Sequence, residues 1–182
     1  MTEIEVHARD FATARHAAAG QVRKYSGEPY INHPAAVVEL VRSVAHTPAM
    51  LAAAWLHDTV EDTDATLDDI ARDFGAEVAQ LVEMLTNVSR ATDGDRATRK
   101  RLDREHLSRA NRAAKTIKLA DVIDNTRDIA QRDPEFATVY LAEKALLLEG
   151  LRDGDATLWR RADELVHSTV LHAPRGARGV RG

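Results

Sequence analysis

Two histidines and two aspartates of this chain could bind a metal ion together. They are His33, the adjacent pair His57 and Asp58, and Asp121. The sequence contains no cysteine, and imidazole and carboxylate ligands suit a divalent cation such as Zn, Mn or Fe better than a thiol-loving metal. The His57-Asp58 pair directly follows an apolar run, residues 50–56, that we expect to be buried. Because a buried ionisable pair needs a partner or a metal, these residues predict a metal site.

Two more carboxylates follow this pair at helical spacing. Glu61 lies four residues after His57, and Asp62 lies four residues after Asp58. On a continuous helix each of these two pairs would share one face. Taken alone, such acids more often face solvent at a polar helix end, but acids next to a metal commonly orient or deprotonate an attacking water. We therefore interpret Glu61 and Asp62 as candidate catalytic residues.

The segment around Asp121 adds a hydrogen-bonding group. Asn125 lies four residues after Asp121, so the two side chains would share a helical face, and Asn125 could bond a ligand or a metal-bound water. The other histidines have no acidic partner arranged in this way, and we interpret them as structural. They are His7, His16, His46, His106, His167 and His172.

The elements that must position these groups are predicted to be helical. Hydrophobic residues recur at helical spacing, Ala and Leu are abundant, and no convincing run of alternating β-branched residues is present. The sequence therefore predicts an all-α fold of about eight to ten helices. The expected helices are residues 6–22, one opened by His33-Pro34, one from Pro48 through Glu61, one between Thr66 and Gly75, and residues 76–87, 111–131, 135–151 and 157–171.

Length and charge limit the class of protein. A chain of 182 residues favours one domain, which we expect to cover residues 1–172, with a disordered Gly-, Pro- and Arg-rich tail at residues 173–182. The net charge of −4 gives no bulk electrostatic reason to bind nucleic acid or an anionic membrane. No stretch reaches the ~20 apolar residues of a membrane-spanning helix, and no signal peptide is visible. We expect a cytoplasmic protein and leave its oligomeric state open.

Three phrases of the sequence together resemble a known family. They are Gly-Glu-Pro-Tyr-Ile-Asn-His-Pro at residues 27–34, Ala-Trp-Leu-His-Asp-Thr-Val-Glu-Asp-Thr at residues 54–63, and Lys-Leu-Ala-Asp at residues 118–121. These phrases look like the HD-domain hydrolases of the RelA/SpoT type. The resemblance implies a compact helical HD-domain bundle that removes the 3′-pyrophosphate from the alarmones ppGpp and pppGpp, leaving GDP or GTP. Because the long members add synthetase and regulatory domains, this chain is similar to the stand-alone small alarmone hydrolases of the stringent response.

The resemblance also implies a role for each candidate residue. One metal ion, usually Mn²⁺, would be held by His33, His57, Asp58 and Asp121. Zn or Fe suits the same ligands. Glu61 and Asp62 match the acidic pair that handles the water. The residues implied to contact the nucleotide are Arg23, Lys24, Asn125, Arg96 and Tyr140.

Charge considerations support an anionic nucleotide as the substrate. An alarmone is a polyanion and the chain is net negative, so recognition needs cations concentrated near the metal. Two clusters qualify, Arg23-Lys24 and residues 96–101, although the second could also be a solvated helix face. Relatives often carry a lysine and, two residues later, a glutamate before this second run. The corresponding residues here are Arg96 and Thr98, so an arginine can still bind phosphate but the salt-bridging acid is missing.

Three other functions remain open on the sequence. An HD phosphohydrolase with the same metal site could act on another nucleotide, such as NADPH. A non-catalytic alarmone-binding module would bind the nucleotide without turnover, although the complete set of candidate ligands and acids argues against it. A purely structural helical domain would bind no metal.

Overall fold

The computed structural model describes residues 1–172, except the side chains of residues 128, 130, 131, 134 and 169–172. Within these residues the chain forms ten α-helices and one short 3-10 helix, η1 (Ala91–Asp93), with a single isolated β-bridge between Val22 and Pro29. The α-helices are α1 (Glu3–Ala18), α2 (Asn32–Arg42), α3 (Pro48–Leu56), α4 (Thr59–Asp62), α5 (Leu67–Phe74), α6 (Ala76–Leu85), α7 (Arg96–Ser108), α8 (Arg112–Arg132), α9 (Pro134–Gly150) and α10 (Ala156–His172). The all-α prediction is confirmed, whereas the predicted tail lies outside the described residues.

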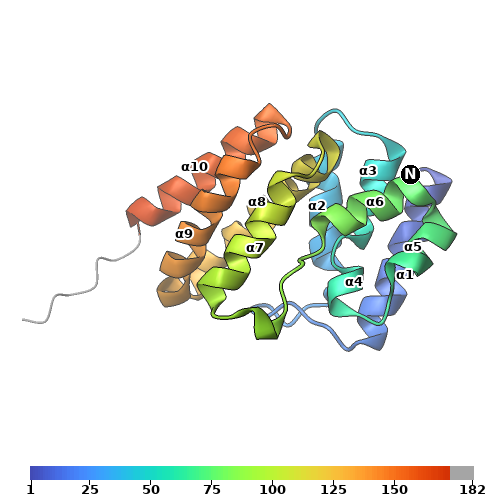
Figure 1. The fold of residues 1–182 in the computed structure, drawn as a ribbon, viewed down its shortest axis with the longest axis horizontal. Coiled ribbons are helices and arrows are strands. Elements are labelled where there is room, and N and C mark those ends of the chain that lie inside the picture. Colours follow the sequence, from blue (N-terminus) through green and yellow to red (C-terminus); the bar gives the residue numbers. More distant parts are fainter. Residues whose placement is uncertain (173–182) are drawn as a thin grey trace, which may run out of the picture.

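The helices are arranged around α3 and α8. Helix α8 packs against α9 and α10 on one side and against α2 on the other, while α3 packs against α1, α2 and α6. Figure 1 shows α9 and α10 at one end of the molecule and α1 and α5 at the opposite end. The segments that carry the candidate metal ligands, α2, the end of α3 and α8, therefore meet in the middle of the bundle.

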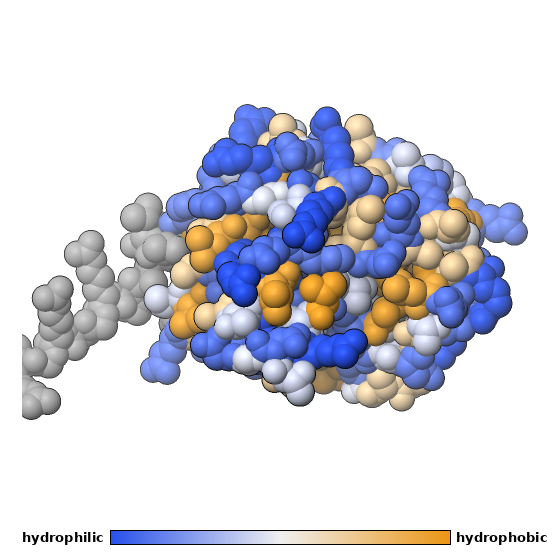
Figure 2. All heavy atoms as spheres, in the orientation of Figure 1, coloured by the Kyte–Doolittle hydropathy of each residue, from blue (hydrophilic) through white to orange (hydrophobic). Residues whose placement is uncertain are grey.

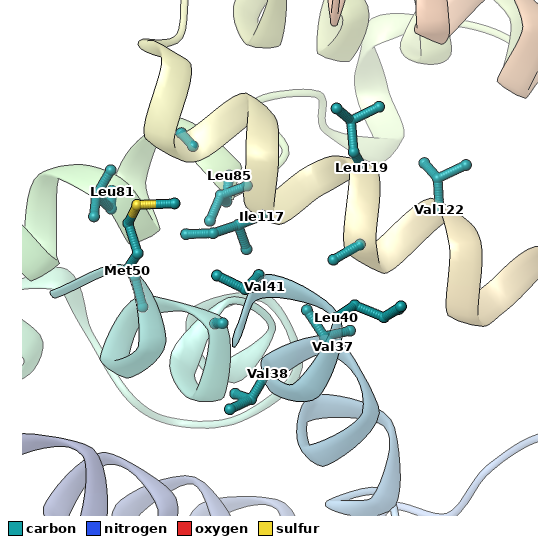
Figure 3. Packing of buried hydrophobic residues seen from close by; sticks show 14 of the residues in the cluster. Val37, Val38, Leu40, Val41, Met50, Leu81, Leu85, Ile117, Leu119 and Val122 are labelled. Atoms are coloured by element: carbon teal, nitrogen blue, oxygen red, sulfur yellow. The ribbon is translucent and has the colours of Figure 1, made fainter. Parts of the chain in front are cut away.

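The hydrophobic core explains why these segments meet. Every residue of α3 from Ala49 to Leu56 is buried, as expected for a helix that is apolar on all sides. Figure 3 shows Met50 of α3 beside Val41 of α2 and Ile117 of α8.

Figure 2 shows hydrophilic residues over most of one outer face, with hydrophobic residues in small groups between them. In the part of the chain that the structure describes, no helix is long and apolar enough to cross a membrane.

Several helix ends follow the local signals of the sequence. Helix α3 begins at Pro48, and the Thr47 side chain caps it by accepting a hydrogen bond from the Met50 N–H. Thr66 caps α5 in a reciprocal capping box with Asp69. Gly75 ends α5 with φ of +86°, a backbone conformation that favours glycine. These predicted boundaries are confirmed.

The prediction of one helix from Pro48 through Glu61 is wrong, because the helix is interrupted at the candidate ligands. Helix α3 ends at Leu56, and α4 begins at Thr59. Asp58 leaves ideal helical geometry with φ of −103° and ψ of −5°, and its Oδ2 accepts a hydrogen bond from the Tyr30 hydroxyl at 2.6 Å. One element of the predicted spacing survives, since the Asp62 N–H still donates to the Asp58 carbonyl at 3.0 Å.

Candidate metal centre

The four candidate ligands come together although they lie on different segments. His33 is the second residue of α2, His57 and Asp58 lie between α3 and α4, and Asp121 lies in the middle of α8. The His33 Nε2 is 3.2 Å from Asp121 Oδ1 and 3.6 Å from Asp58 Oδ2. The His57 Nε2 is 3.1 Å from the same Asp58 oxygen. Ligand atoms of His33, His57 and Asp58 all lie within 4.8 Å of one another, a spacing that one ion could bridge, and Asp121 is not in this cluster but contacts it through His33.

The hydrogen bonds of the two imidazoles orient them for a metal. The Nδ1 of His57 donates to the Ala54 carbonyl at 2.8 Å, and the Nδ1 of His33 donates to Asp124 Oδ2 at 2.6 Å, on the tautomers that these partners require. The Nε2 atoms of both rings are buried and have no hydrogen-bond partner among the described residues. Two Nε2 atoms facing two carboxylates form a donor set that fits a divalent cation.

The charges at the centre are those that a cation requires. Burial alone would raise the pKa of Asp58 and Asp121, but the charge of His57 lowers the pKa of Asp58 and that of Lys118 lowers the pKa of Asp121, each below its usual range. Burial lowers the pKa of His33, yet the neighbouring carboxylates of Asp121 and Asp124 outweigh it and raise the pKa to about 9. The carboxylates thus hold a proton on His33, and a bound cation would take its place.

Three residues that we did not predict as site residues hold these ligands in place. Lys118 Nζ lies 2.7 Å from Asp121 Oδ2, and the Tyr30 hydroxyl binds Asp58. Asp124 Oδ2 accepts from His33 and also lies 3.1 Å from Arg23 Nη2, so one carboxylate connects a metal ligand to a predicted nucleotide contact. Lys118, three residues before Asp121, could have been inferred from helical spacing. The contacts of Tyr30 and Asp124 have no local signal in the sequence.

A cavity of about 220 Å³ lies beside the centre and contains four of the five predicted nucleotide contacts. Its lining residues are Arg23, Lys24, Tyr25, Tyr30, Asn125, Ile129, Phe136 and Tyr140. Tyr30 and Asn125 also touch the metal ligands, because Asn125 Nδ2 donates to Asp121 Oδ1 at 2.6 Å. This aromatic cavity, as we call it, therefore lies next to the metal centre.

Two cations of the aromatic cavity contact its other lining residues: Arg23 bonds the Asn125 amide, and Lys24 lies over two aromatic rings. Arg23 Nη1 donates to Asn125 Oδ1 at 3.4 Å. The ammonium group of Lys24 lies 4.8 Å from the ring centroid of Tyr25 and 5.3 Å from that of Phe136. Lys24 itself is exposed. The cavity thus combines flat apolar surfaces with positive charge at its rim.

A second hollow, of about 440 Å³, extends past Glu61, and we call it the basic groove. Its cationic lining residues are Arg90, Arg96, Arg99 and Lys100. Arg96 donates to Glu143 of α9 with Nε at 2.7 Å and Nη2 at 2.9 Å. Relatives often have a glutamate at the position of Thr98. Here Glu143 of α9 supplies the acid that pairs with Arg96 instead. The Arg96 guanidinium also lies 5.3 Å from the ring centroid of Phe136, so it stands between the two hollows.

The structure places the two candidate catalytic acids differently. Glu61 lines the basic groove and accepts hydrogen bonds from the backbone N–H of Asn87 at 2.6 Å and from its Nδ2 at 2.8 Å. Desolvation by the surrounding protein and the negative charge of Asp58 raise the pKa of Glu61. The charge of Lys118 and the hydrogen bonds from Asn87 lower this pKa, but by less, so the pKa is raised overall. Asp62 is exposed at the end of α4 and does not line either hollow.

Comparison with known proteins places the chain in a family. Residues 8–148 match the family model described as HD domain. Guanosine-3′,5′-bis(diphosphate) 3′-pyrophosphohydrolase MESH1 of Homo sapiens is 42% identical over 133 residues, which are 71% of this chain and 72% of the relative. The protein of the same name from Xenopus tropicalis is 34% identical over 88% of this chain and 91% of its own length.

A solved structure supports the same placement. It is described as a metazoan ortholog of SpoT that hydrolyzes ppGpp, and it superposes with a TM-score of 0.82 at 31% identity. The superposition covers 92% of this chain and 96% of the solved one. Since both the sequence and the fold match over most of their lengths, the chain belongs to the HD-domain family, in the branch that contains these pyrophosphohydrolases.

Proposed function

We propose that this protein is a metal-dependent 3′-pyrophosphohydrolase of ppGpp and pppGpp, which releases pyrophosphate and leaves GDP or GTP. The observation that carries the proposal is that residues next to the metal ligands line both hollows: Tyr30 and Asn125 line the aromatic cavity, and Glu61 lines the basic groove. Such an arrangement suits a substrate with a flat base at one end and several phosphates at the other. The names of the relatives point to the same reaction.

The aromatic cavity would hold the guanosine part of the substrate. Tyr25, Phe136 and Tyr140 offer rings on which a base can stack, and Asn125 offers an amide beside the metal ligands. Arg23 would contact a phosphate or the base while Asp124 fixes its direction. The phosphates would extend toward Arg96 in the basic groove, because the substrate is a polyanion.

His33, His57, Asp58 and Asp121 would hold one divalent cation, which we propose to be Mn²⁺. A bound ion of this kind supplies Lewis-acid polarisation of a phosphate oxygen and makes water more acidic. The residues around the ligands keep this donor set rigid: Asp124 orients His33, and Lys118 and Asn125 each bind one oxygen of Asp121.

Glu61 or Asp62 would position the attacking water or take its proton. The raised pKa of Glu61 suits a group that must accept a proton near neutral pH, and Asn87 holds its carboxylate in a fixed direction. The water oxygen forms a bond to the phosphorus attached to the 3′-oxygen, and the bond between that phosphorus and the 3′-oxygen breaks. The 3′-oxygen then receives a proton, so the products are a nucleotide with a free 3′-hydroxyl and pyrophosphate.

The test is to incubate the purified, Mn-loaded protein with ppGpp, pppGpp, GTP and NADPH and to separate the products by anion-exchange chromatography. We expect GDP with pyrophosphate from ppGpp, and GTP with pyrophosphate from pppGpp. Turnover of NADPH without turnover of either alarmone would instead identify an HD phosphohydrolase of another nucleotide. Tight ppGpp binding without products would indicate a binding module. A single domain over residues 1–172 and a cytoplasmic location belong to the same proposal.

A further inference from the structure

Three lysines surround a small cavity that the proposed reaction has not yet used. The cavity has a volume of about 70 Å³ and is lined by Lys100 of α7, Lys118 of α8 and Lys144 of α9. Asn87 and Lys100 line both this cavity and the basic groove, so the two spaces adjoin. Lys118 also contacts Asp121, and the cavity therefore lies next to the candidate metal centre. We call it the lysine cavity.

Only one of these three lysines has a carboxylate partner in the described part of the chain. The ammonium group of Lys118 lies 2.7 Å from Asp121 Oδ2, whereas no salt bridge between described residues includes Lys100 or Lys144. Two acids that line the cavity are bound elsewhere. Asp103 accepts hydrogen bonds from the backbone of residues 88 and 89, and Glu143 is bound by the guanidinium of Arg96.

The surroundings of Lys144 make its positive charge costly. Its ammonium group lies 4.9 Å from the ring centroid of Tyr140, a residue that is buried. Burial and the neighbouring charges of Lys118 and Lys100 lower the pKa of Lys144 to about 8. A half-buried ammonium group beside two other cations is unfavourable unless an anion compensates it. The cavity is thus lined by three ammonium groups, of which only that of Lys118 is paired with a carboxylate among the described residues.

We propose that Lys100, Lys118 and Lys144 form an oxyanion subsite that binds one phosphoryl group of the substrate's 3′-diphosphate and then of the pyrophosphate product. This inference rests on the proposed function. The volume fits such a group, because ~10–15 Å³ is needed for one water and the cavity of about 70 Å³ would hold several waters but no nucleoside. Ammonium groups bind phosphate oxygens through charge-assisted hydrogen bonds. Lys118 connects the subsite to the metal ligand Asp121.

The test measures pyrophosphate binding by equilibrium dialysis with radiolabelled pyrophosphate and the metal-loaded protein. The first variant is Lys144→Met, which keeps the length of the side chain and removes the charge. We expect it to weaken pyrophosphate binding by ~10–100-fold, the range for loss of hydrogen bonds to a charged group. Binding of GDP and the metal content by elemental analysis should stay unchanged. Lys144→Arg, which keeps the charge, should restore most of the pyrophosphate affinity.

A matched control removes a buried lysine of the same helix as Lys118 that does not line the cavity. Lys115 of α8 is buried and pairs with the exposed Asp153 at 3.1 Å. Lys115→Met should leave pyrophosphate binding unchanged. Lys100→Gln, at a half-exposed position of α7, gives a second measurement if Lys144→Met impairs folding, and it should also weaken pyrophosphate binding. Wild-type affinity in both Lys144→Met and Lys100→Gln would overturn the subsite.

The same samples separate this inference from the proposed function. If the wild-type protein releases pyrophosphate from ppGpp while Lys144→Met and Lys100→Gln bind pyrophosphate normally, the subsite is wrong and the function stands. If the wild-type protein cleaves no alarmone but Lys144→Met loses pyrophosphate binding, the function is wrong and the anion subsite stands.

Discussion

The metal centre and the basic groove use charge in opposite ways. In the metal centre, His33, His57 and Asp121 are buried, and each carries a second contact that fixes its direction. In the basic groove the cations are exposed or half-exposed, and Lys100 has no carboxylate partner among the described residues. A prearranged set of imidazole and carboxylate ligands suits a metal cation, and a more open positive surface suits a polyphosphate. The two regions should therefore respond differently to the loss of one charge.

The largest effect should come from removing a ligand of the metal centre. Asp58→Ala takes away the carboxylate that both imidazoles face, so metal binding and turnover should be lost together. We expect metal affinity to fall by more than the ~10–100-fold that loss of a supporting contact typically costs. Elemental analysis of the purified variant and the ppGpp assay would measure both. Asp64→Ala, at an exposed carboxylate paired with Arg15, is the control and should change neither.

The next effect separates chemistry from metal binding. Asp62→Ala should keep the metal and lose turnover by ~10²–10⁴-fold, the usual contribution of a positioned acid or base. The Asp62 backbone N–H, not its side chain, bonds the Asp58 carbonyl, so the metal ligand should stay in place. Steady-state kinetics with ppGpp and metal analysis of the same preparation give the answer. Full activity in Asp62→Ala would mean that the role assigned to Asp62 is wrong and would leave Glu61 as the candidate.

A smaller effect should follow from loosening one ligand. Asp124→Asn keeps an acceptor for the His33 Nδ1–H but removes the negative charge that also faces Arg23. Metal affinity should fall by ~10–100-fold, and the KM for ppGpp should rise because Arg23 no longer faces the negative charge of Asp124. Titration of the metal-free protein with Mn²⁺ measures the first effect independently of activity. The control is Asp163→Asn, which alters a histidine–aspartate pair with the exposed His167 and should leave both values unchanged.

Features set by neighbouring residues could be predicted from the sequence. Pro48, Thr66 and Gly75 set helix ends through local geometry, so those boundaries could be predicted from neighbouring residues. The i to i+4 contact of Asn125 with Asp121 was predictable for the same reason. The helix break at Asp58 could not be predicted, because it accompanies a hydrogen bond from Tyr30, which is 28 residues away.

Long-range pairs explain what else the sequence did not reveal. His33 and Asp124 are 91 residues apart, and Arg96 and Glu143 are 47 apart. Both pairs exist because helices pack side by side, and no pattern along one helix encodes the register of its neighbour. The ligand types could therefore be predicted from the sequence, whereas the contacts of Tyr30 and Asp124 with the ligands and the pairing of Arg96 in the groove required the fold.

The smallest of these effects should come from the basic groove, where several cations could contact the substrate phosphates. Arg96→Ala should raise the KM for ppGpp by about tenfold, the cost of one charge-assisted hydrogen bond, with kcat and metal content unchanged. Stability should change little, because Arg96 is 47% exposed and such pairs contribute ~0–1 kcal/mol. Glu143→Gln should raise KM less, since it keeps the guanidinium and loosens only its orientation.

Arg101 provides the matched control, because it lies on the same helix and pairs with Glu105 four residues on, but does not line the groove. Arg101→Ala removes the same charge from the protein, so a general loss of electrostatic attraction would raise KM equally in both variants. An effect of Arg96→Ala alone would instead locate phosphate recognition in the groove. Equal effects would mean that the groove acts only through its overall charge and that the contrast with the prearranged metal centre is greater than we propose.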